Sequence, residues 1–212
     1  MKTLLINEFT VLHHKQAGTV PLEEQSIYGE KNIKDDKACN DCMHFFSLSC
    51  EKQVFKLRTN KQITLINIEN FFNSFKEKIK GQRCDFLLYD DSKIILMDLT
   101  CTMEEHLFPH LLNEKKRQGK RLSARYQIEN TIKVLIEEPV IRNYIDRKGT
   151  KLGILAYRVK DEDLFQNVPK SIEKTMKVWL SMENIIETRK LSFPMQFGFT
   201  FEMVKYPNVY NW

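Results

Sequence analysis

Long apolar runs are absent from this sequence. No stretch approaches the roughly 18 uncharged apolar residues that a membrane-spanning helix needs, because Lys, Glu, Asp or Arg recurs throughout the 212 residues. The apolar run Leu4–Ile6 is interrupted at Asn7 and Glu8, before it reaches the length of a signal-peptide core. We therefore expect neither a membrane segment nor export.

Glycine, proline and cysteine are also scarce, with 7, 6 and 5 residues. With 42% hydrophobic residues, the composition is not that of a disordered chain, and the length suits a single domain over residues 1–212. The odd number of cysteines, in a chain large enough not to need disulfides, predicts free thiols in a reducing cytoplasm. The net charge of +5 is a mild tilt toward polyanions and by itself decides little about function.

The hydrophobic pattern predicts an α/β domain with a central mixed sheet flanked by helices. Residues 1–12 are interpreted as an opening strand, because Leu5, Asn7, Phe9 and Val11 share one parity. Residues 13–51 are polar and rich in turn residues. The runs 54–57 and 63–66 then predict a hairpin around the turn at 59–61.

Helical and strand-like periods alternate in the remaining sequence. We expect a helix from the N-cap Asn67 to Lys80, followed by two strands at 84–89 and 94–99. A helix over 123–138, ended by Pro139, a strand at 152–157 and a helix over 170–186 come next. The last element is a half-buried strand at 193–203 whose Phe197, Phe199 and Phe201 face the core. The two runs at 84–89 and 94–99 are apolar almost without a break, which is typical of strands covered on both faces.

Two aspartates stand inside these two apolar strands. If the turn is centred between Asp91 and Ser92, antiparallel pairing places Asp85 opposite Asp98. Opposed side chains have Cβ atoms only about 4.5–5.5 Å apart, and like charges at that distance are destabilising. A Mg²⁺ or Mn²⁺ ion bound by both carboxylates would compensate them, as in phosphoryl chemistry. Thr100 lies on the same strand face as Asp98.

This order of elements and these acids resemble the PD-(D/E)XK nuclease superfamily over residues 67–158. The resemblance implies a restriction-endonuclease-like core in which Asp85 and Asp98 are the metal ligands, Glu69 is the acid of the preceding helix and Gln127 is the glutamine of the following helix. Thr100 stands where that superfamily has a lysine. The missing cation or base then comes from Lys115, Lys116 or Lys120, or from an imidazole of His106 or His110, as in mismatch-repair nucleases of the very-short-patch type; otherwise the site is inactive.

Five basic residues gather just before the second predicted helix: Lys115, Lys116, Arg117, Lys120 and Arg121. They would add salt-dependent affinity for nucleic acid by contacting phosphates, or they form a solvated loop. Cys39 and Cys42 have the spacing of a zinc corner, with His44 and Cys50 nearby, but a second such pair is absent. A structural zinc site and free cysteines both remain open for that segment.

We therefore expect a metal-dependent nuclease that hydrolyses phosphodiester bonds, of DNA rather than RNA. The alternative is a catalytically inactive subunit of the same fold that binds nucleic acid or a partner protein in a restriction, transposition or phage-defence complex. A third interpretation is a zinc-stabilised interaction domain centred on residues 39–50. In the expected organisation, residues 1–66 form an amino-terminal extension that carries this loop, and residues 159–212 complete the fold.

Overall fold

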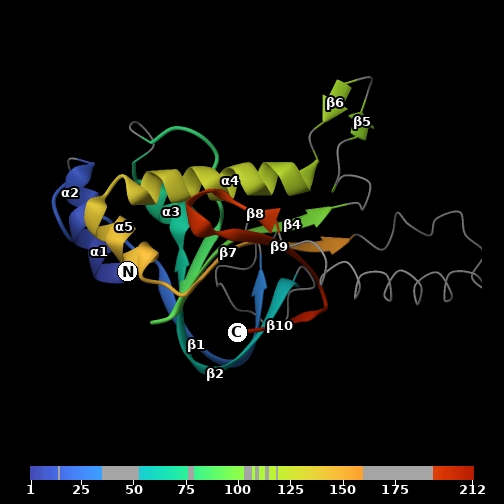
Figure 1. The fold of residues 1–212 in the computed structure, drawn as a ribbon, viewed down its shortest axis with the longest axis horizontal. Helices are drawn as coiled ribbons and strands as arrows, with labels where there is room; N and C mark the ends of the chain where they lie inside the picture. Colours follow the sequence, from blue (N-terminus) through green and yellow to red (C-terminus); the bar gives the residue numbers. More distant parts are fainter. Residues whose placement is uncertain are drawn as a thin grey trace, which may run out of the picture.

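A mixed β-sheet forms the centre of the protein (Figure 1). The computed structural model describes residues 1–13, 15–34, 53–75, 79–102, 107, 110–112, 115–117, 119–159 and 193–212. Within these ranges the sheet has the strand order β1-β2-β3-β4-β7-β9-β8, and β10 pairs with β2. The bounds are β1 (Glu24–Lys34), β2 (Gln53–Asn67), β3 (Phe86–Tyr89), β4 (Lys93–Thr102), β7 (Thr150–Val159), β8 (Phe193–Pro194), β9 (Thr200–Lys205) and β10 (Val209–Asn211).

Strand directions confirm the predicted α/β class with a mixed sheet. Strands β2, β3 and β4 are antiparallel, whereas β7 runs parallel to β4 and β9 runs parallel to β7. Helices α4 (Lys120–Ile136) and α5 (Pro139–Asp146) lie between β4 and β7 in the chain, so they form the crossover that a parallel pair requires. A separate two-stranded sheet, β5 (His110–Leu112) with β6 (Lys115–Arg117), lies near the start of α4 (Figure 1).

Both faces of β4 are buried, which explains its unbroken apolar run. Ile94 and Leu96 belong to the core on the helical face, which is filled by side chains of the amino-terminal helices, α3, α4 and α5. Ile95 and Met97 belong to a second core on the opposite face. There the covering layer is the long β1–β2 ribbon, and β2 reaches across to contact β7 and β9. Among the described elements, the helices therefore pack on one face only.

The amino-terminal segment is helical, so the expected opening strand is wrong. It consists of α1 (Lys2–Leu4), η1 (Leu5–Phe9), which has π-helical geometry, and α2 (Thr10–Leu12). Leu5 and Phe9 are both fully buried, and their spacing of four is helical as well as even. Val11, the next residue of the predicted strand face, is 55% exposed. The spacing of Leu5 and Phe9 fits one face of a strand as well as one face of a helix, and this explains the wrong prediction.

The predicted hairpin at 54–66 is also wrong, because both of its runs belong to the single strand β2. Their common partner is β1, in a segment whose polar sequence did not predict a strand. The pairing passes from Ile27–Ile63 to Gly29–Thr59, so the residues taken for a turn form an irregularity inside β2. Gly29 has a φ of +79°, a left-handed conformation that glycine adopts readily.

Helix α3 (Ile68–Asn73) begins where expected but is short. The side chain of Asn67 accepts a hydrogen bond from the Asn70 amide at 3.0 Å, which confirms the predicted N-cap. The helix ends at Asn73, before the expected Lys80, and residues 76–78 lie outside the described ranges.

The second predicted helix is confirmed as α4, which differs from the expected range by only a few residues at each end. Pro139 then opens the additional helix α5 instead of only closing α4, with Glu138 as its N-cap.

The predicted strand at 152–157 is confirmed within β7, but the last one, at 193–203, is divided. Strands β8 and β9 are joined through η4 (Gln196–Gly198), where Phe197 has a φ of 62° and is 39% exposed. Phe199 and Phe201 are buried as predicted, whereas the assignment of Phe197 to the core is wrong. The predicted helix over 170–186 lies outside the described residues. No helix in the described ranges combines the length and apolar character needed to cross a membrane.

Candidate functional site

Asp85 is held in place by three of its own groups. Its backbone carbonyl accepts the amides of Ile68 at 3.1 Å and Glu69 at 3.3 Å, which satisfies two N–H groups at the start of α3. Its amide donates to the Met97 carbonyl at 3.1 Å, and its carboxylate Oδ2 accepts the Leu99 amide at 2.7 Å. The first turn of α3 and strand β4 therefore fix the position of this acid together.

The register predicted for the two central strands is confirmed over four residue pairs, from Tyr89–Ile94 to Phe86–Met97. Asp85 follows as a bend residue just outside that ladder. Asp98 and Thr100 lie in β4, and both are almost fully buried. They share strand parity with Leu96, so they lie on the face that α4 covers.

Cys84 lies close to both aspartates. Burial raises the pKa of the Cys84 thiol well above its usual value, and the charges of Asp85 and Asp98 raise it further. The hydrogen bond from the Leu99 amide to Asp85 Oδ2 places the Asp85 carboxylate next to Asp98, the residue before Leu99. A thiol with a raised pKa stays protonated, so Cys84 is suited to packing rather than to nucleophilic chemistry.

Helix α4 holds the segment that leads into Asp85. Thr131 Oγ1 accepts the Cys84 amide at 3.1 Å, Gln127 Nε2 donates to the Arg83 carbonyl at 3.2 Å, and Asn130 Nδ2 donates to the Gln82 carbonyl at 3.0 Å. One face of the helix thus satisfies three consecutive backbone positions. Gln127 therefore has a positioning role next to the candidate site.

The height of α4 above the sheet depends on a close approach at Gly153 of β7. A Cβ atom at Gly153 would come within 3.0 Å of Ile128 Cγ2. Glycine at that position lets the helix lie close enough for Gln127 and Asn130 to reach the segment before Asp85.

Arg83 is a buried cation that the sequence pattern did not reveal. Burial lowers the pKa of the Arg83 guanidinium, while the charge of Glu69 acts in the opposite direction. The guanidinium lies over the ring of Phe72 at 5.5 Å, and it donates to the carbonyl of Ile79. Glu69 therefore compensates Arg83 electrostatically. Within the described ranges, no group of three His, Cys, Asp or Glu side chains is placed to hold a metal ion, so Glu69, Asp85 and Asp98 do not form such a triad.

The other predicted site residues are placed only in part. Lys120 is exposed and Arg121 is half-buried at the start of α4. Lys115, Lys116 and Arg117 form strand β6, and His110 begins β5, but only their backbone is described. The candidate zinc ligands and one candidate base lie outside the described residues: Cys39, Cys42, His44, Cys50 and His106.

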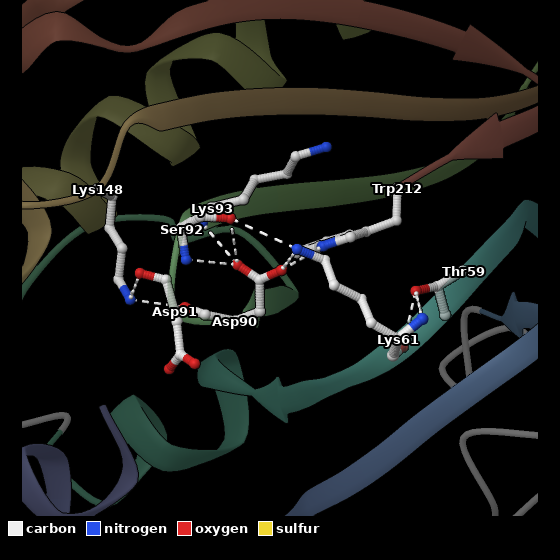
Figure 2. A network of polar contacts seen from close by, with 8 residues as sticks. All are labelled: Thr59, Lys61, Asp90, Asp91, Ser92, Lys93, Lys148 and Trp212. Atoms are coloured by element: carbon white, nitrogen blue, oxygen red, sulfur yellow. Dashed lines mark hydrogen bonds and ion pairs between the residues drawn. The ribbon is translucent and has the colours of Figure 1, made fainter.

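Asp90 is the centre of a polar network at the opposite end of the β3–β4 pair (Figure 2). Its carboxylate accepts the amides of Ser92 and Lys93, each at 2.7 Å, and the indole Nε1 of Trp212 at 2.7 Å. Lys61 forms an ion pair with the same carboxylate. Burial alone would raise the pKa of Asp90, but these contacts outweigh it and hold the pKa well below its ordinary value.

Lys148 adds a second cation to that turn. Its ammonium donates to the backbone carbonyls of Asp90 at 2.6 Å and Asp91 at 3.0 Å (Figure 2). It also lies over the ring of Tyr144. The sequence pattern indicated only a turn here, because Lys61, Lys148 and Trp212 are distant in the chain.

The described residues thus place one acid-rich site on the helical face of the sheet and one charge-compensated turn at the other end of the same strands. No family model, curated protein or solved structure matches this chain.

Proposed function

We propose that this protein is a metal-dependent nuclease that hydrolyses phosphodiester bonds of DNA, with Asp85 and Asp98 as ligands of Mg²⁺ or Mn²⁺. The observation that carries the proposal is the position of the Asp85 carboxylate, which accepts the amide of Leu99 at 2.7 Å and so lies next to the buried Asp98, on the face of the sheet that α4 covers. Two acids in such surroundings repel one another, and a divalent cation relieves that repulsion.

The donor set suits a hard divalent cation. Both residues offer carboxylate oxygens, which Mg²⁺ prefers, and Mg²⁺ in phosphoryl-transfer sites is commonly bound by one or two carboxylates plus phosphate oxygens. Asp85 is fixed by α3 and β4, so its carboxylate is oriented in advance. A bound ion would lower the pKa of a water molecule and neutralise charge on the phosphate.

The order of elements supports the same proposal. Helix α3, strands β3 and β4, helix α4 and strand β7 follow one another as they do in the PD-(D/E)XK nucleases, to which the sequence bears a resemblance. The resemblance also assigns Glu69 and Gln127 to the site. Their contacts give them supporting roles, since Glu69 compensates Arg83 and Gln127 holds the backbone next to Cys84.

The surrounding basic side chains would attract the substrate. Lys120 is exposed at the start of α4, in the same part of the chain as the basic β6. Cationic side chains there would bind the sugar-phosphate backbone in a sequence-independent and salt-dependent manner.

The second candidate function is that of an inactive subunit with the same fold, which binds nucleic acid or a partner protein. The observation that favours it is Thr100, which is almost fully buried two residues after Asp98. A hydroxyl group carries no positive charge with which to stabilise the transition state.

Cleavage of plasmid and single-stranded DNA, with Mg²⁺, Mn²⁺ or EDTA, tests the nuclease proposal. We expect the native protein to cut in either metal and Asp98→Ala to lose about a thousandfold or more of the rate, since a catalytic metal contributes several kcal/mol. Asp91→Ala is the matched control, because Asp91 is an exposed aspartate at the other end of the same strands. Equal rates for Asp98→Ala and native protein would contradict the proposal.

Metal binding separates the two candidate functions. If the site holds Mn²⁺, the ion should raise the melting temperature of native protein and of Asp91→Ala, but not of Asp98→Ala. Folded native protein that neither cleaves DNA nor gains stability from Mn²⁺ would favour the inactive subunit.

A further inference from the structure

A polar groove of about 330 Å³ opens beside α4. It is lined by Gln82, Tyr126, Gln127, Glu129, Asn130 and Lys133. Its volume is at the lower end of the range for small-ligand sites, about 300–1,000 Å³. Five of the six lining residues belong to α4, and the sixth belongs to the segment that leads to Asp85.

Two amide groups in the groove have fixed orientations. Gln127 and Asn130 lie one helical turn apart, and each donates its NH₂ group to a backbone carbonyl, of Arg83 and Gln82 respectively. Reversing either amide would place two carbonyl oxygens against each other, so the orientation is determined by the contact. From the described residues, no hydrogen bond reaches the side-chain carbonyl oxygens of these two amides. They are therefore preorganised acceptors in the groove wall.

The same groove presents an aromatic ring and a cation. Tyr126 is 52% exposed although it lies on a packed helix, and Lys133 is exposed two turns further along. Glu129, by contrast, is buried and paired with Arg125 at 3.1 Å, so its charge is already compensated. The groove thus combines a flat apolar surface, two acceptors and one positive charge.

This combination suits a nucleobase with its phosphate. Aromatic side chains stack on any base, amide oxygens accept hydrogen bonds from base N–H groups, and an ammonium binds phosphate. The exocyclic amino groups of adenine, cytosine and guanine offer two N–H donors, whereas thymine has only its ring N–H. Two acceptors side by side therefore favour a base that carries an amino group.

The groove is also linked to the candidate site. Gln127 lines the groove and holds the carbonyl of Arg83, two residues before Asp85. A nucleic acid strand whose phosphate lies at Asp85 would therefore have a neighbouring nucleotide within reach of the groove.

We propose that this groove binds one unpaired nucleobase of single-stranded nucleic acid, stacked on Tyr126 and hydrogen-bonded by Gln127 and Asn130. The inference rests on the proposed function for the class of ligand, and it makes the protein a reader of single-stranded segments. It does not require the site at Asp85 and Asp98 to be catalytic.

Fluorescence anisotropy of labelled oligo(dA), oligo(dC) and oligo(dT) in EDTA tests the inference without cleavage. We expect Tyr126→Ala to raise the Kd for oligo(dA) about tenfold, the loss that corresponds to removal of one stacking contact. Tyr126→Phe should bind like native protein, because it keeps the ring. Tyr28→Ala is the matched control, since Tyr28 is 67% exposed on β1 and does not line the groove.

Base identity and base removal sharpen the test. Native protein should bind oligo(dA) and oligo(dC) more tightly than oligo(dT), and it should bind a fully abasic strand about as weakly as Tyr126→Ala binds oligo(dA). Equal binding of abasic and intact strands, equal effects of Tyr126→Ala and Tyr28→Ala, or no binding of any strand would overturn the inference.

The cleavage assay distinguishes this failure from failure of the proposed function. If binding depends on Tyr126 but the protein does not cleave DNA in Mn²⁺, the groove is a base-binding site and the nuclease proposal is contradicted. If cleavage depends on Asp98 but Tyr126→Ala binds as native protein does, the nuclease proposal is supported and the base-binding groove is contradicted.

Discussion

Asp90 and Asp98 lie near opposite ends of the same strand pair. Asp98 is almost fully buried, and Asp90 is half-buried with 8% of its side chain exposed. Their surroundings differ in charge. Asp90 receives the ammonium of Lys61 and N–H groups from Ser92, Lys93 and Trp212. Asp98 lies next to Asp85, whose carboxylate accepts the amide of Leu99. One end of the pair gathers opposite charges and the other gathers like charges.

The difference indicates what each acid does for the protein. A buried carboxylate with a cation and several N–H donors is compensated by the chain itself, so it contributes to the stability of the turn. Two carboxylates brought together lower the stability of the folded chain, and a bound cation would remove that cost. We therefore assign Asp90 to the fold and Asp85 with Asp98 to the proposed function.

The largest expected difference is in stability without metal. Asp90→Asn should lower the free energy of unfolding by about 2 kcal/mol, because the Lys61 ion pair is lost and four hydrogen bonds, including one from the Ser92 hydroxyl, lose their charged acceptor. Asp98→Asn should change it by less than about 1 kcal/mol, since the substitution also removes repulsion with Asp85. Urea unfolding in EDTA measures both.

Asp91→Asn provides the control for the first of these changes. This exposed neighbour should alter stability by no more than about 0.5 kcal/mol. Equal losses from Asp90→Asn and Asp98→Asn would remove the distinction between the two ends.

The contribution of Asp90 to the free energy of unfolding should decrease at acid pH. Its pKa in the folded protein lies well below the ordinary value of about 3.9, so the ionised form is stabilised by folding. The contribution is complete above about pH 5, and it is lost as the pH falls through the ordinary pKa toward the folded one. The difference between native protein and Asp90→Asn should therefore shrink below about pH 4, as measured by urea unfolding at stepped pH. A difference that stayed constant down to pH ~2 would contradict this assignment.

The register of the central strands followed from local information. Two apolar runs separated by a short polar turn leave few alternatives, and the predicted pairing from Tyr89–Ile94 to Phe86–Met97 is the one found. The N-cap at Asn67 and helix α4 depend on similarly local signals. Placing Asp85 and Asp98 near each other required only this register.

The network at Asp90 was not predictable in this way. The residues expected to reverse the chain at 59–61 instead form an irregularity in β2, where Thr59 Oγ1 accepts the amide of Lys61 at 3.2 Å. Lys61 then points toward Asp90 (Figure 2). Both the irregularity and its partner strand β1 depend on long-range pairing, which periodicity does not encode.

The amino-terminal helix and Phe197 were missed for other reasons. Leu5 and Phe9 satisfy both an even spacing and a helical one, so the period alone could not decide between them. Phe197 shares parity with two buried phenylalanines, but its left-handed backbone turns its side chain outward. A positive φ at a non-glycine residue has no signal in the apolar pattern.

A smaller loss of stability than that of Asp90→Asn isolates a single contact in the Asp90 network. Trp212→Phe keeps an aromatic ring near Lys93, whose ammonium lies 4.9 Å from the indole, but it removes the Nε1 donor to Asp90. We expect a loss of about 1 kcal/mol in the free energy of unfolding, because one hydrogen bond to a carboxylate is broken while most of the packing remains.

A double-mutant cycle with Asp90→Asn distinguishes the hydrogen bond from the packing of the ring. If Trp212 acts through the Asp90 carboxylate, Trp212→Phe should cost clearly less in the Asp90→Asn background than in native protein, because the charged acceptor is already gone. Identical losses in the two backgrounds would mean that Trp212 contributes by packing alone. The Asp90 charge would then be compensated by Lys61 and by the Ser92 and Lys93 amides, without a contribution from Trp212. The difference in charge compensation between Asp90 and Asp98 would be smaller by one hydrogen bond.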